Sequence, residues 1–380
     1  MDLTGNAVLA LLILTSGYAL MILWFTLPLF RKRARTAGSA EIPFISVIVA
    51  ARNEEKNIRA CVEDILSQDY PADRFELIVS DDHSADRTKA EVLEAGSSHP
   101  AIKLAFLEAH EGDGSGKKQA IMRAVQIARG EVILTTDADT RHGPGWLSSM
   151  AEVFSAPGIR MVLGPVRLGG ESMFQKLQSL EFMGVMGLTA GSAFRGAPLM
   201  CNGANFMYDK RGFEETGGLA GSMHYPSGDD QFLLAAYRKR YGGRAVSFAL
   251  SREATVTTLA EPSLAGFFHQ RMRWVSKSKG YRDPAVIMSG VLTYVVHTAL
   301  LAGLLAGFFY PPLLLAALAC WSGKMIAEFP MVAGMASFFG KAGYLWLYVP
   351  AQMFQLVYVP AAGLSGLLLP YRWKGRVIRA

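Results

Sequence analysis

The sequence is poor in cysteine. Its 380 residues include only three, Cys61, Cys201 and Cys320, which lie far apart and show no metal-ligand spacing. A disulfide framework or a cysteine-bound zinc site is therefore not expected, and buried free thiols in a reducing compartment fit better. No Ser-His-Asp or Cys-His pattern indicates covalent nucleophilic catalysis.

Long stretches also lack charge. No Lys, Arg, Asp or Glu occurs from Val8 to Phe30 or from Pro284 to Gly323, and a third apolar stretch runs from Ala342 to Pro370. The first is long enough to cross a bilayer. Pro311-Pro312 predicts that the second is a hairpin or a kinked pair. Together these stretches indicate membrane segments at both ends of the chain.

The residues between these stretches add two expectations. His297 is the only side chain from Pro284 to Gly323 that can carry a positive charge, and a buried, hydrogen-bonded histidine is the simplest interpretation. Lys324 and Glu328 fall in a less apolar segment that we expect at the membrane interface.

Basic residues concentrate beside the apolar stretches. Arg31–Arg35 and Tyr371–Ala380 hold four cations each and no acids; removing these eight leaves 38 − 8 = 30 basic against 32 acidic residues. Nucleic acid is therefore not an expected partner, whereas cytoplasmic flanks of membrane segments carry such an excess. We expect an integral protein of the cell or inner membrane. Its start would lie outside and its middle and tail in the cytoplasm, which requires three or five crossings.

This pattern predicts three parts. Residues 1–36 would be an uncleaved N-terminal transmembrane anchor, because cations follow rather than precede the apolar run. Residues 37–283 have the composition of a globular α/β domain ending in an interfacial helix, and residues 284–380 would be membrane helices with a basic tail.

Strands and helices alternate in the middle part. Strands are expected at Phe44–Ala51, Phe75–Asp81, Ile102–Glu108, Glu131–Asp137 and Ile159–Val166, with a helix at Ser115–Gly130. This order predicts a largely parallel sheet, in which ligands bind at the carboxyl ends of the strands. Three polar endings, "AARNEE", "SDDHS" and "TDADT", would meet along that edge.

The ending "TDADT" places Asp137 and Asp139 directly after a strand. Such a pair can bind Mg²⁺ or Mn²⁺, with phosphates and waters completing the shell. A helix N-cap at Asp139 or Thr140 is the alternative. "EGDGSGKK" (Glu111–Lys118) fails the P-loop template and can equally be a mobile loop that carries Lys117 to an anion or a plain flexible loop.

Two later segments favour a catalytic interpretation. Asp229 and Asp230 begin a helix after a Pro-Ser-Gly turn, where a carboxylate can be a general base or a cap. Gln270, Arg273 and Trp274 fall at i, i+3 and i+4 of a helix and share a face. Arginine suits a diphosphate and tryptophan a sugar ring, although an interfacial helix explains the same residues.

The ordered set of these motifs resembles the membrane-bound, processive-type family 2 glycosyltransferases, which include cellulose, chitin and hyaluronan synthases and ceramide glucosyltransferase. The resemblance covers about Phe44 to Trp274. It implies a GT-A nucleotide-sugar-binding domain with a mostly parallel sheet, flanked by transmembrane helices. It also implies an inverting hexosyltransferase that moves a sugar, most simply from a UDP-sugar, to a hydroxyl of a lipid-linked or polysaccharide acceptor, assisted by Mg²⁺ or Mn²⁺.

The resemblance also assigns roles. Asp230 would be the general base with Asp229 beside it, and Asp137 and Asp139 would bind the diphosphate and its metal. The expected donor and acceptor contacts are Ala51, Arg52, Glu54, Asp81, Asp82, Lys117, Asp137, Asn202, Asn205, Gln270, Arg273 and Trp274.

Two motifs depart from the family pattern, since D-D-G-S is D-D-H-S here and T-E-D has become G-D-D. The second change leaves Asp229 as an alternative base. Two other functions were weighed: a nucleotide-sugar-binding subunit without transfer activity in a polysaccharide assembly or export complex, and a transporter with a regulatory domain. Retention of every acidic motif speaks against the first, and the scarcity of intramembrane charge against the second.

Overall fold

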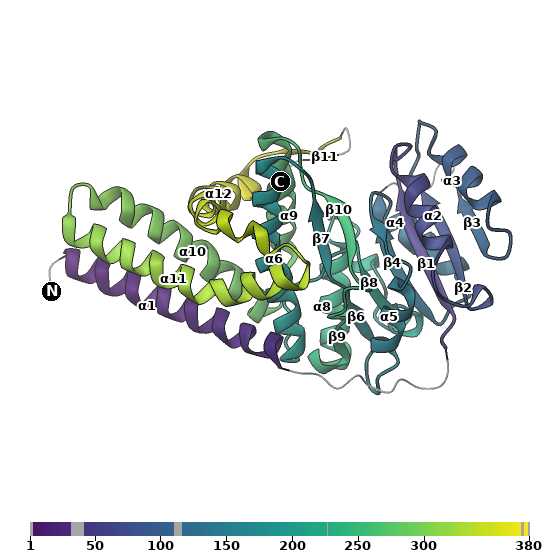
Figure 1. Cartoon of the computed structure of the whole chain (residues 1–380), viewed down its shortest axis with the longest axis horizontal. Helices are drawn as coiled ribbons and strands as arrows, with labels where there is room; N and C mark the ends of the chain where they lie inside the picture. The colour runs from purple at the N-terminus through teal and green to yellow at the C-terminus, as the bar shows by residue number, and fades with distance from the viewer. Residues whose placement is uncertain (1–2, 32–41, 110–115, 226, 374–375, 379–380) are drawn as a thin grey trace. The chain divides into compact units, whose positions relative to one another are not determined.

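The structure, a computed structural model, describes residues 3–31, 42–109, 116–225, 227–373 and 376–378. Figure 1 shows the chain, which falls into two units. The helical unit contains Met1–Arg31, Gly170–Gly191 and Ala260–Ala380, and the sheet unit contains Lys32–Gly169 and Ser192–Leu259. The cations Lys32–Arg35 and residues 111–115 of "EGDGSGKK" lie outside the described residues, as does the expected boundary at 36/37. The boundary at 283/284 stays a prediction.

Seven strands form the main sheet of the sheet unit, in the order β3-β2-β1-β4-β8-β6-β9. The first four are parallel to one another, β8 is antiparallel to β4 and β6, and β9 is parallel to β6. Every residue of β2 is buried, as expected for a strand covered on both faces. The strands are β1 (Ile45–Ala51), β2 (Phe75–Asp81), β3 (Lys103–Leu107), β4 (Val132–Asp137), β6 (Met161–Leu163), β8 (Phe206–Asp209) and β9 (Val246–Phe248).

A second, three-stranded sheet has the order β5-β10-β7. Its strands are β5 (Arg141–His142), β7 (Val166–Gly169) and β10 (Val256–Leu259). The single strand expected at Ile159–Val166 is therefore wrong in extent. Pro165 lacks an N–H and interrupts pairing, so β6 joins the main sheet and β7 joins the second one.

The helices of the sheet unit follow the strands in the expected alternation. Those between the parallel strands are α2 (Ile58–Leu66), α3 (Thr88–Ser97) and α4 (Lys117–Ile127), and the later ones are α5 (Trp146–Phe154), α7 (Lys210–Glu215) and α8 (Asp229–Tyr241). A further helix, α6 (Met173–Phe194), leaves the helical unit between Gly191 and Ser192.

The helical unit is built around α1 (Leu3–Thr26), α10 (Pro284–Gly307) and α11 (Pro311–Phe338), which pack side by side. The expected break at Pro311 is confirmed, since α10 and α11 form a hairpin. Gly307 permits this close turn, because a Cβ there would lie 2.7 Å from the Cα of Leu314. The unit also contains α9 (Leu264–Ser276), α12 (Tyr348–Leu368), β11 (Tyr371–Trp373) and β12 (Arg376–Ile378).

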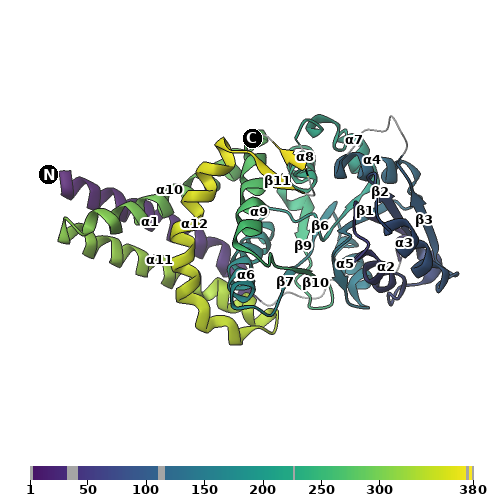
Figure 2. The same cartoon turned by 90° about the horizontal axis from the view of Figure 1, so that it is seen from above.

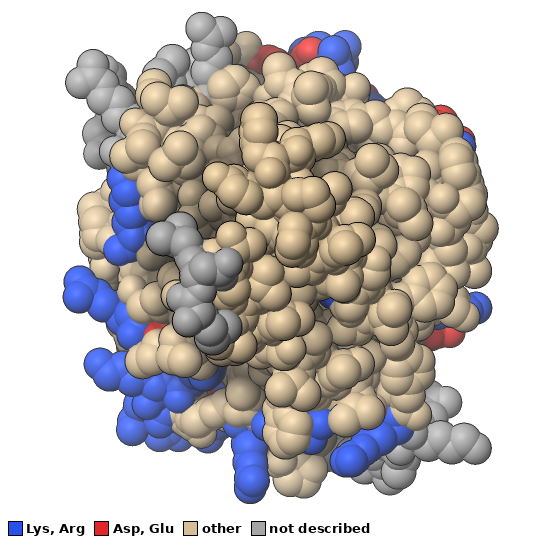
Figure 3. Space-filling view, turned by 90° about the vertical axis from the view of Figure 1, so that its left-hand side faces the viewer, with Lys and Arg blue, Asp and Glu red and all other residues tan. Residues whose placement is uncertain are grey.

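Four helical segments among the described residues are long and apolar enough to cross a membrane: Thr4–Phe30, Pro284–Gly307, Pro311–Phe338 and Ala342–Leu368. The last of these differs from the others in direction. Figure 1 shows α12 end-on, and Figure 2 shows it running crosswise to α1, α10 and α11. Figure 3 shows the end of the helical unit, where uncharged residues cover most of the surface.

A polar network lies inside this bundle. Lys324 is fully buried, and its Nζ donates to Glu328 Oε2 at 2.9 Å and to Gln352 Oε1 at 2.7 Å. Glu328 Oε1 accepts from the Tyr18 hydroxyl at 2.5 Å. The expected interfacial position of Lys324 and Glu328 is therefore wrong, because each charge has partners that allow it to be buried.

His297 follows expectation. It is 2% exposed, and its Nδ1 lies 2.7 Å from the Thr293 carbonyl oxygen, a distance at which an Nδ1–H donates to it.

Candidate active site

The three polar strand endings meet at one edge of the main sheet. The register pairs Ala51 at the end of β1 with Asp81 at the end of β2, and Ala50 with Asp137 at the end of β4. The chain folds this way because continuous apolar runs form buried parallel strands, whose carboxyl ends share an edge. The expected convergence is confirmed.

Asp82 is tied to two neighbouring segments. Its Oδ1 accepts a 2.7 Å hydrogen bond from the Gly116 N–H, at the start of α4. Arg52 Nη1 donates to the Asp82 carbonyl oxygen at 2.8 Å and lies 3.6 Å from Asp82 Oδ2. Two expected nucleotide contacts, Arg52 and Asp82, therefore touch each other.

Asp81 has one satisfied and one unsatisfied carboxylate oxygen. Oδ2 accepts from the Ser84 N–H at 2.9 Å. Oδ1 is buried and has no hydrogen-bond partner among the residues that the structure describes. A buried acceptor without a partner is costly, so a ligand N–H or O–H at this position would be stabilised.

The loop after β1 is fixed by backbone contacts. The Ala51 carbonyl accepts from the Asp82 N–H at 2.8 Å. The Glu54 N–H donates to Thr88 Oγ1, and Glu54 Oε2 accepts from Asn57 Nδ2, both at 2.9 Å. Ala51 and Glu54 are both buried, so they hold the end of β1 and the loop after it in place.

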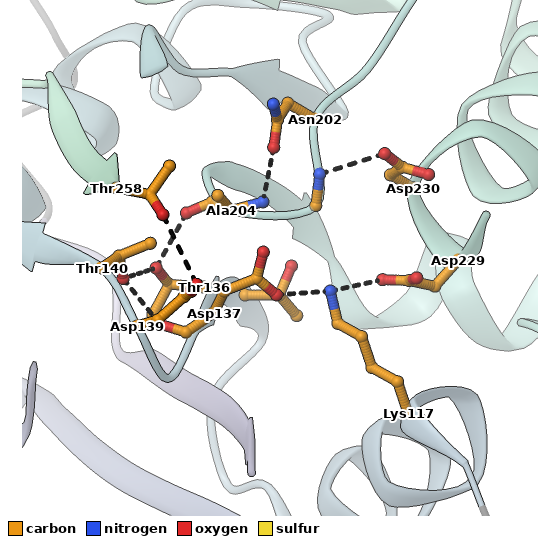
Figure 4. A network of polar contacts seen from close by, with 12 residues as sticks. Lys117, Thr136, Asp137, Asp139, Thr140, Asn202, Ala204, Asp229, Asp230 and Thr258 are labelled. Carbon is orange, nitrogen blue, oxygen red and sulfur yellow. Dashed lines mark hydrogen bonds and ion pairs between the residues drawn. The ribbon is translucent and has the colours of Figure 1, made fainter. Parts of the chain in front are cut away.

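Lys117 joins two of the acidic motifs. Its Nζ lies 2.6 Å from Asp137 Oδ1 and 3.1 Å from Asp229 Oδ2, as Figure 4 shows. Burial alone would lower the pKa of Lys117, but the carboxylates of Asp137 and Asp229 raise it well above its ordinary value. The site therefore holds a permanent cation between the D-x-D turn and the start of α8.

Asp229 and Asp230 occupy the first turn of α8, after Gly228 with φ +90°. Glycine reaches this left-handed conformation without strain. Asp230 Oδ2 accepts from the Gly203 N–H at 3.1 Å, while Asp229 faces Lys117. The two adjacent aspartates therefore have different partners.

Asp139 is exposed, unlike the residues that support its turn. Its Oδ2 lies 3.5 Å from Thr258 Oγ1 on β10. Behind it, Thr136 Oγ1 donates to the Ala204 carbonyl at 2.8 Å and lies 2.9 Å from His142 Nε2. This buried network was not found from the sequence; the consecutive threonines before Asp137 were its only signal.

His142 gives the network a pH dependence. Burial lowers the pKa of His142 to about 3, whereas an unfolded histidine titrates near 6.5. Between pH 3 and pH 6.5 the unfolded chain therefore binds a proton at His142 that the folded unit does not. The contribution of the neutral, buried His142 to the free energy of unfolding is fully present above pH 6.5. We expect it to fall by up to about 1.4 kcal/mol per pH unit as the pH drops from 6.5 towards 3.

Thermal unfolding of the detergent-solubilised protein at pH 7.5 and pH 5 measures this effect. The His142→Gln variant should lose less stability over that interval than the wild type. Equal losses would show that His142 does not contribute.

Asn202 and Asn205 differ in their surroundings. Asn202 is partly exposed, and its Oδ1 accepts from the Ala204 N–H at 2.9 Å. Asn205 is 1% exposed: its Oδ1 accepts from Trp146 Nε1, and its Nδ2 donates to the carbonyls of Pro165 and Ala254. We interpret Asn205 as holding the segment in place, which leaves Asn202 as the acceptor-side candidate.

Gln270, Arg273 and Trp274 lie on α9, which belongs to the helical unit, whereas the acidic residues of the sheet edge belong to the sheet unit. Gln270 Nε2 donates to Glu261 Oε1 at 3.4 Å. Arg271, which lies between Gln270 and Arg273, was not predicted from the sequence as a site residue. Its guanidinium is buried 4.1 Å from the Trp274 ring centroid and bonds Glu181 Oε2 at 2.5 Å.

Glu181 also accepts, through Oε1, a 2.5 Å hydrogen bond from the Tyr358 hydroxyl on α12. Arg271 and Glu181 therefore connect α9 to α6 and α12. An arginine within a basic helix gives no sequence signal that separates a buried ion pair from an exposed cation.

Two family models match this chain. "Glycosyl transferase family 2" matches residues 46–217, and "Glycosyl transferase family group 2" matches residues 132–361. This chain belongs to the family 2 glycosyltransferases. The membership expected from the acidic motifs and Q-x-x-R-W is confirmed.

Relatives within the family include an N-acetylglucosaminyltransferase of Bradyrhizobium diazoefficiens, 26% identical over 74% of this chain and 58% of that protein. A beta-monoglucosyldiacylglycerol synthase of Synechocystis is 31% identical over 32% of this chain and 25% of its own length. A poly-beta-1,6-N-acetyl-D-glucosamine synthase of Staphylococcus epidermidis is 25% identical over 62% of this chain and 54% of its length. The chain thus spans from a quarter to under two thirds of these three relatives.

Among solved structures, the mannosyltransferase PcManGT from Pyrobaculum calidifontis, in complex with GDP-Man and Mn²⁺, matches with a TM-score of 0.67. The match covers 96% of this chain and 99% of that one at 20% identity. The chain therefore has the GT-A fold of this glycosyltransferase family, as the order of strands and helices predicted.

Proposed function

We propose that this chain is a membrane-bound, inverting glycosyltransferase that moves a sugar from a nucleotide-sugar donor to an acceptor hydroxyl. The observation that carries the proposal is the cluster at the carboxyl edge of the sheet, where Lys117 contacts both Asp137 and Asp229. A diphosphate needs cations, and an attacking hydroxyl needs a carboxylate base. The cluster combines both within one site.

Asp230 would be the base. The Asp229 carboxylate is engaged in an ion pair with Lys117, while Asp230 contacts the backbone of Gly203. Asp230 takes the proton from the acceptor hydroxyl as its oxygen attacks the anomeric carbon. The bond from that carbon to the diphosphate breaks, and the nucleoside diphosphate leaves with the bonding electrons. One displacement inverts the anomeric centre through an oxocarbenium-like state.

Lys117 would stabilise the leaving diphosphate. Because its pKa is raised, it stays protonated at any physiological pH. Arg273 and Gln270 on α9 are the proposed additional contacts to the diphosphate, and Trp274 to a sugar ring. Arg52, Asp81 and Asp82 would hold the nucleoside.

The acidic residues suit a divalent cation. Asp139 is exposed and Asp137 keeps 35% of its side chain accessible. Among the described residues no three His, Cys, Asp or Glu side chains are grouped as a metal site. Two carboxylates completed by phosphate oxygens and waters is the arrangement that Mg²⁺ favours. Asp137 and Asp139 would therefore hold Mg²⁺ or Mn²⁺, which supplies charge to the diphosphate; the solved mannosyltransferase contains Mn²⁺.

The Asp139→Asn variant tests this assignment. Its Mn²⁺-dependent affinity for the donor should fall by about 10–100-fold, the scale on which altered metal sites lose affinity. Calorimetric titration with nucleotide, with Mn²⁺ and with EDTA, measures it. The variant and the wild type should agree in EDTA, and equal affinities in Mn²⁺ would contradict the role.

The helical unit supports a topology with three crossings, by α1, α10 and α11. Ser276 Oγ donates to the Tyr371 hydroxyl oxygen at 3.3 Å, so the chain after α12 returns to the end of α9, close to where α10 begins. The chain returns in this way if α10 and α11 cross the membrane as a hairpin and α12, which runs crosswise to them, does not cross it. The cations of the basic tail would then lie on the cytoplasmic side, where such residues are enriched.

The acceptor class follows from the setting and from the relatives. A site carried on membrane helices favours an acceptor that is itself in the membrane or extruded there. Two of the relatives named above are, by their names, synthases of a monoglucosyldiacylglycerol and of poly-beta-1,6-N-acetyl-D-glucosamine. We propose a lipid-linked or polysaccharide acceptor and a UDP-sugar donor.

The test uses purified protein in nanodiscs with Mn²⁺ and a panel of nucleotide sugars, each with a lipid extract as acceptor. Release of a nucleoside diphosphate from one donor, lost in Asp230→Asn, is the expected result. Donor binding without transfer to any acceptor would favour an inactive nucleotide-sugar-binding subunit. Absence of donor binding across the panel would contradict the proposal and favour a transporter.

A further inference from the structure

His83 stands out at the edge of the sheet because of its backbone. It follows Asp81 and Asp82 at the end of β2 and has φ +59°. Residues with a Cβ rarely adopt this left-handed conformation, which favours glycine. Backbone outliers of this kind persist where the surrounding structure imposes them, and they cluster at ligand sites.

The neighbours of His83 impose this conformation. The Ser84 N–H, directly after it, donates to Asp81 Oδ2, and Ser84 Oγ accepts from the Asn53 N–H at 2.9 Å. Asp82, directly before it, is fixed by Arg52 and Gly116. The residues on both sides of His83 are therefore held by contacts with other segments. The backbone of His83 cannot leave the left-handed conformation without breaking those contacts.

The imidazole itself is oriented and accessible. Its Nδ1 lies 3.3 Å from Asp82 Oδ1, and 34% of its side chain is exposed. A carboxylate partner favours the tautomer with hydrogen on Nδ1. Nε2 has no hydrogen-bond partner among the described residues, so this nitrogen of the partly exposed ring is available to a ligand.

A second group nearby lacks a partner. Asp81 is 5% exposed, and its Oδ1 is buried without a hydrogen-bond partner among the described residues. It can accept a ligand N–H, which a nucleobase offers and a sugar-free diphosphate does not. A partly exposed imidazole ring, which can stack on a base, therefore lies two residues from an unsatisfied acceptor.

We propose that His83 is a specificity-determining residue that contacts the nucleobase of the donor and favours the smaller pyrimidine over a purine. The ring occupies space that a glycine would leave open, which disfavours a larger base. This inference rests on the proposed function, because it assumes that a nucleotide binds at this edge.

Nucleotide affinity in nanodiscs tests the proposal without an acceptor. Titrations of UDP, GDP and inorganic pyrophosphate with Mn²⁺ compare the wild type with His83→Gly, in which φ +59° is unstrained. We expect UDP binding to weaken about tenfold, the loss of one stacking contact. The preference for UDP over GDP should shrink, and pyrophosphate binding should stay unchanged.

Two further variants keep the test decisive. His83→Asn accepts the left-handed backbone but lacks the ring, so it should behave as His83→Gly does. His99→Gly removes a histidine between α3 and β3, towards the opposite edge of the sheet, and should bind like the wild type. Thermal unfolding should show His83→Gly at least as stable as the wild type, which separates lost contact from lost folding.

An unchanged ratio of UDP to GDP affinity in His83→Gly would overturn the inference while leaving the proposed function intact. A wild type that prefers GDP would overturn both the inference and the proposed UDP-sugar donor, while sugar transfer from a nucleotide sugar would still stand. A wild type that binds neither nucleotide would overturn the inference and the proposed function. A parallel loss of pyrophosphate affinity would show that His83 acts on the phosphates instead, which also overturns the proposed role.

Discussion

Sugar transfer by the Asp230→Asn variant should fall by about 10²–10⁴-fold, the contribution typical of a general base. The carboxylate accepts two backbone N–H groups, those of Gly203 and Gln231, and the amide oxygen can keep only one of them. We expect the first turn of α8 to persist with that one hydrogen bond lost. Donor affinity should therefore change little. Turnover measured with saturating donor, beside calorimetric binding of the same donor, separates the two quantities.

Asp229→Asn is the matched control, because it changes the adjacent carboxylate by the same atom. This variant removes one of the two partners of Lys117, so we expect weaker donor binding and a smaller loss of turnover. If Asp229→Asn abolished turnover with normal donor binding while Asp230→Asn did not, the base would be Asp229.

Lys324→Met should destabilise the protein by about 3–5 kcal/mol, the cost of leaving a buried charge without its partner. Glu328 would keep the hydrogen bonds from Tyr18 and Gln352 but lose its only cation among the described residues. Thermal unfolding in detergent measures the loss. Activity per folded molecule should be unaffected at low temperature.

The double variant Lys324→Met, Glu328→Leu provides the control. Replacing both charges by apolar groups removes the desolvation cost of each, so most of the lost stability should return. A double variant as unstable as the single one would mean that the polar side chains from α1 and α12 need both charges.

Much of the sheet edge could be predicted because its determinants are local. Apolar runs such as Ile45–Ala51 specify parallel strands, and the residues after each run must then share an edge. The D-x-D pair was found in this way, whereas Asp229 and Asp230 were found as the start of a helix after a Pro-Ser-Gly turn. Parallel geometry brings these residues together although they are far apart in sequence.

The remaining features depend on pairings between distant residues. Nothing local indicates that Lys117 bridges Asp137 and Asp229, or that Lys324 turns inward to meet Gln352. The hydropathy of the segment predicted that Lys324 lies at the membrane interface. A hydropathy value is assigned to each residue separately, so it does not include the ion pair that allows Lys324 to be buried. Likewise, D-D-H-S shows a departure from the family pattern, but only the backbone shows that His83 adopts a left-handed conformation, which favours glycine.

Helix α12 is fastened at two points along its length. Gln352 binds the Lys324 pair inside the bundle, and Tyr358 binds Glu181, the partner of Arg271 on α9. Six residues separate these two contacts, about 9 Å along the helix axis. Rotation of α12 by a single residue position, about 100°, would break both contacts at once. These contacts therefore fix the rotation of α12 about its axis as well as its position. Because the same helix contacts Lys324 of α11 and the Glu181–Arg271 pair, a tilt of α11 within the bilayer would also move α12 and α9.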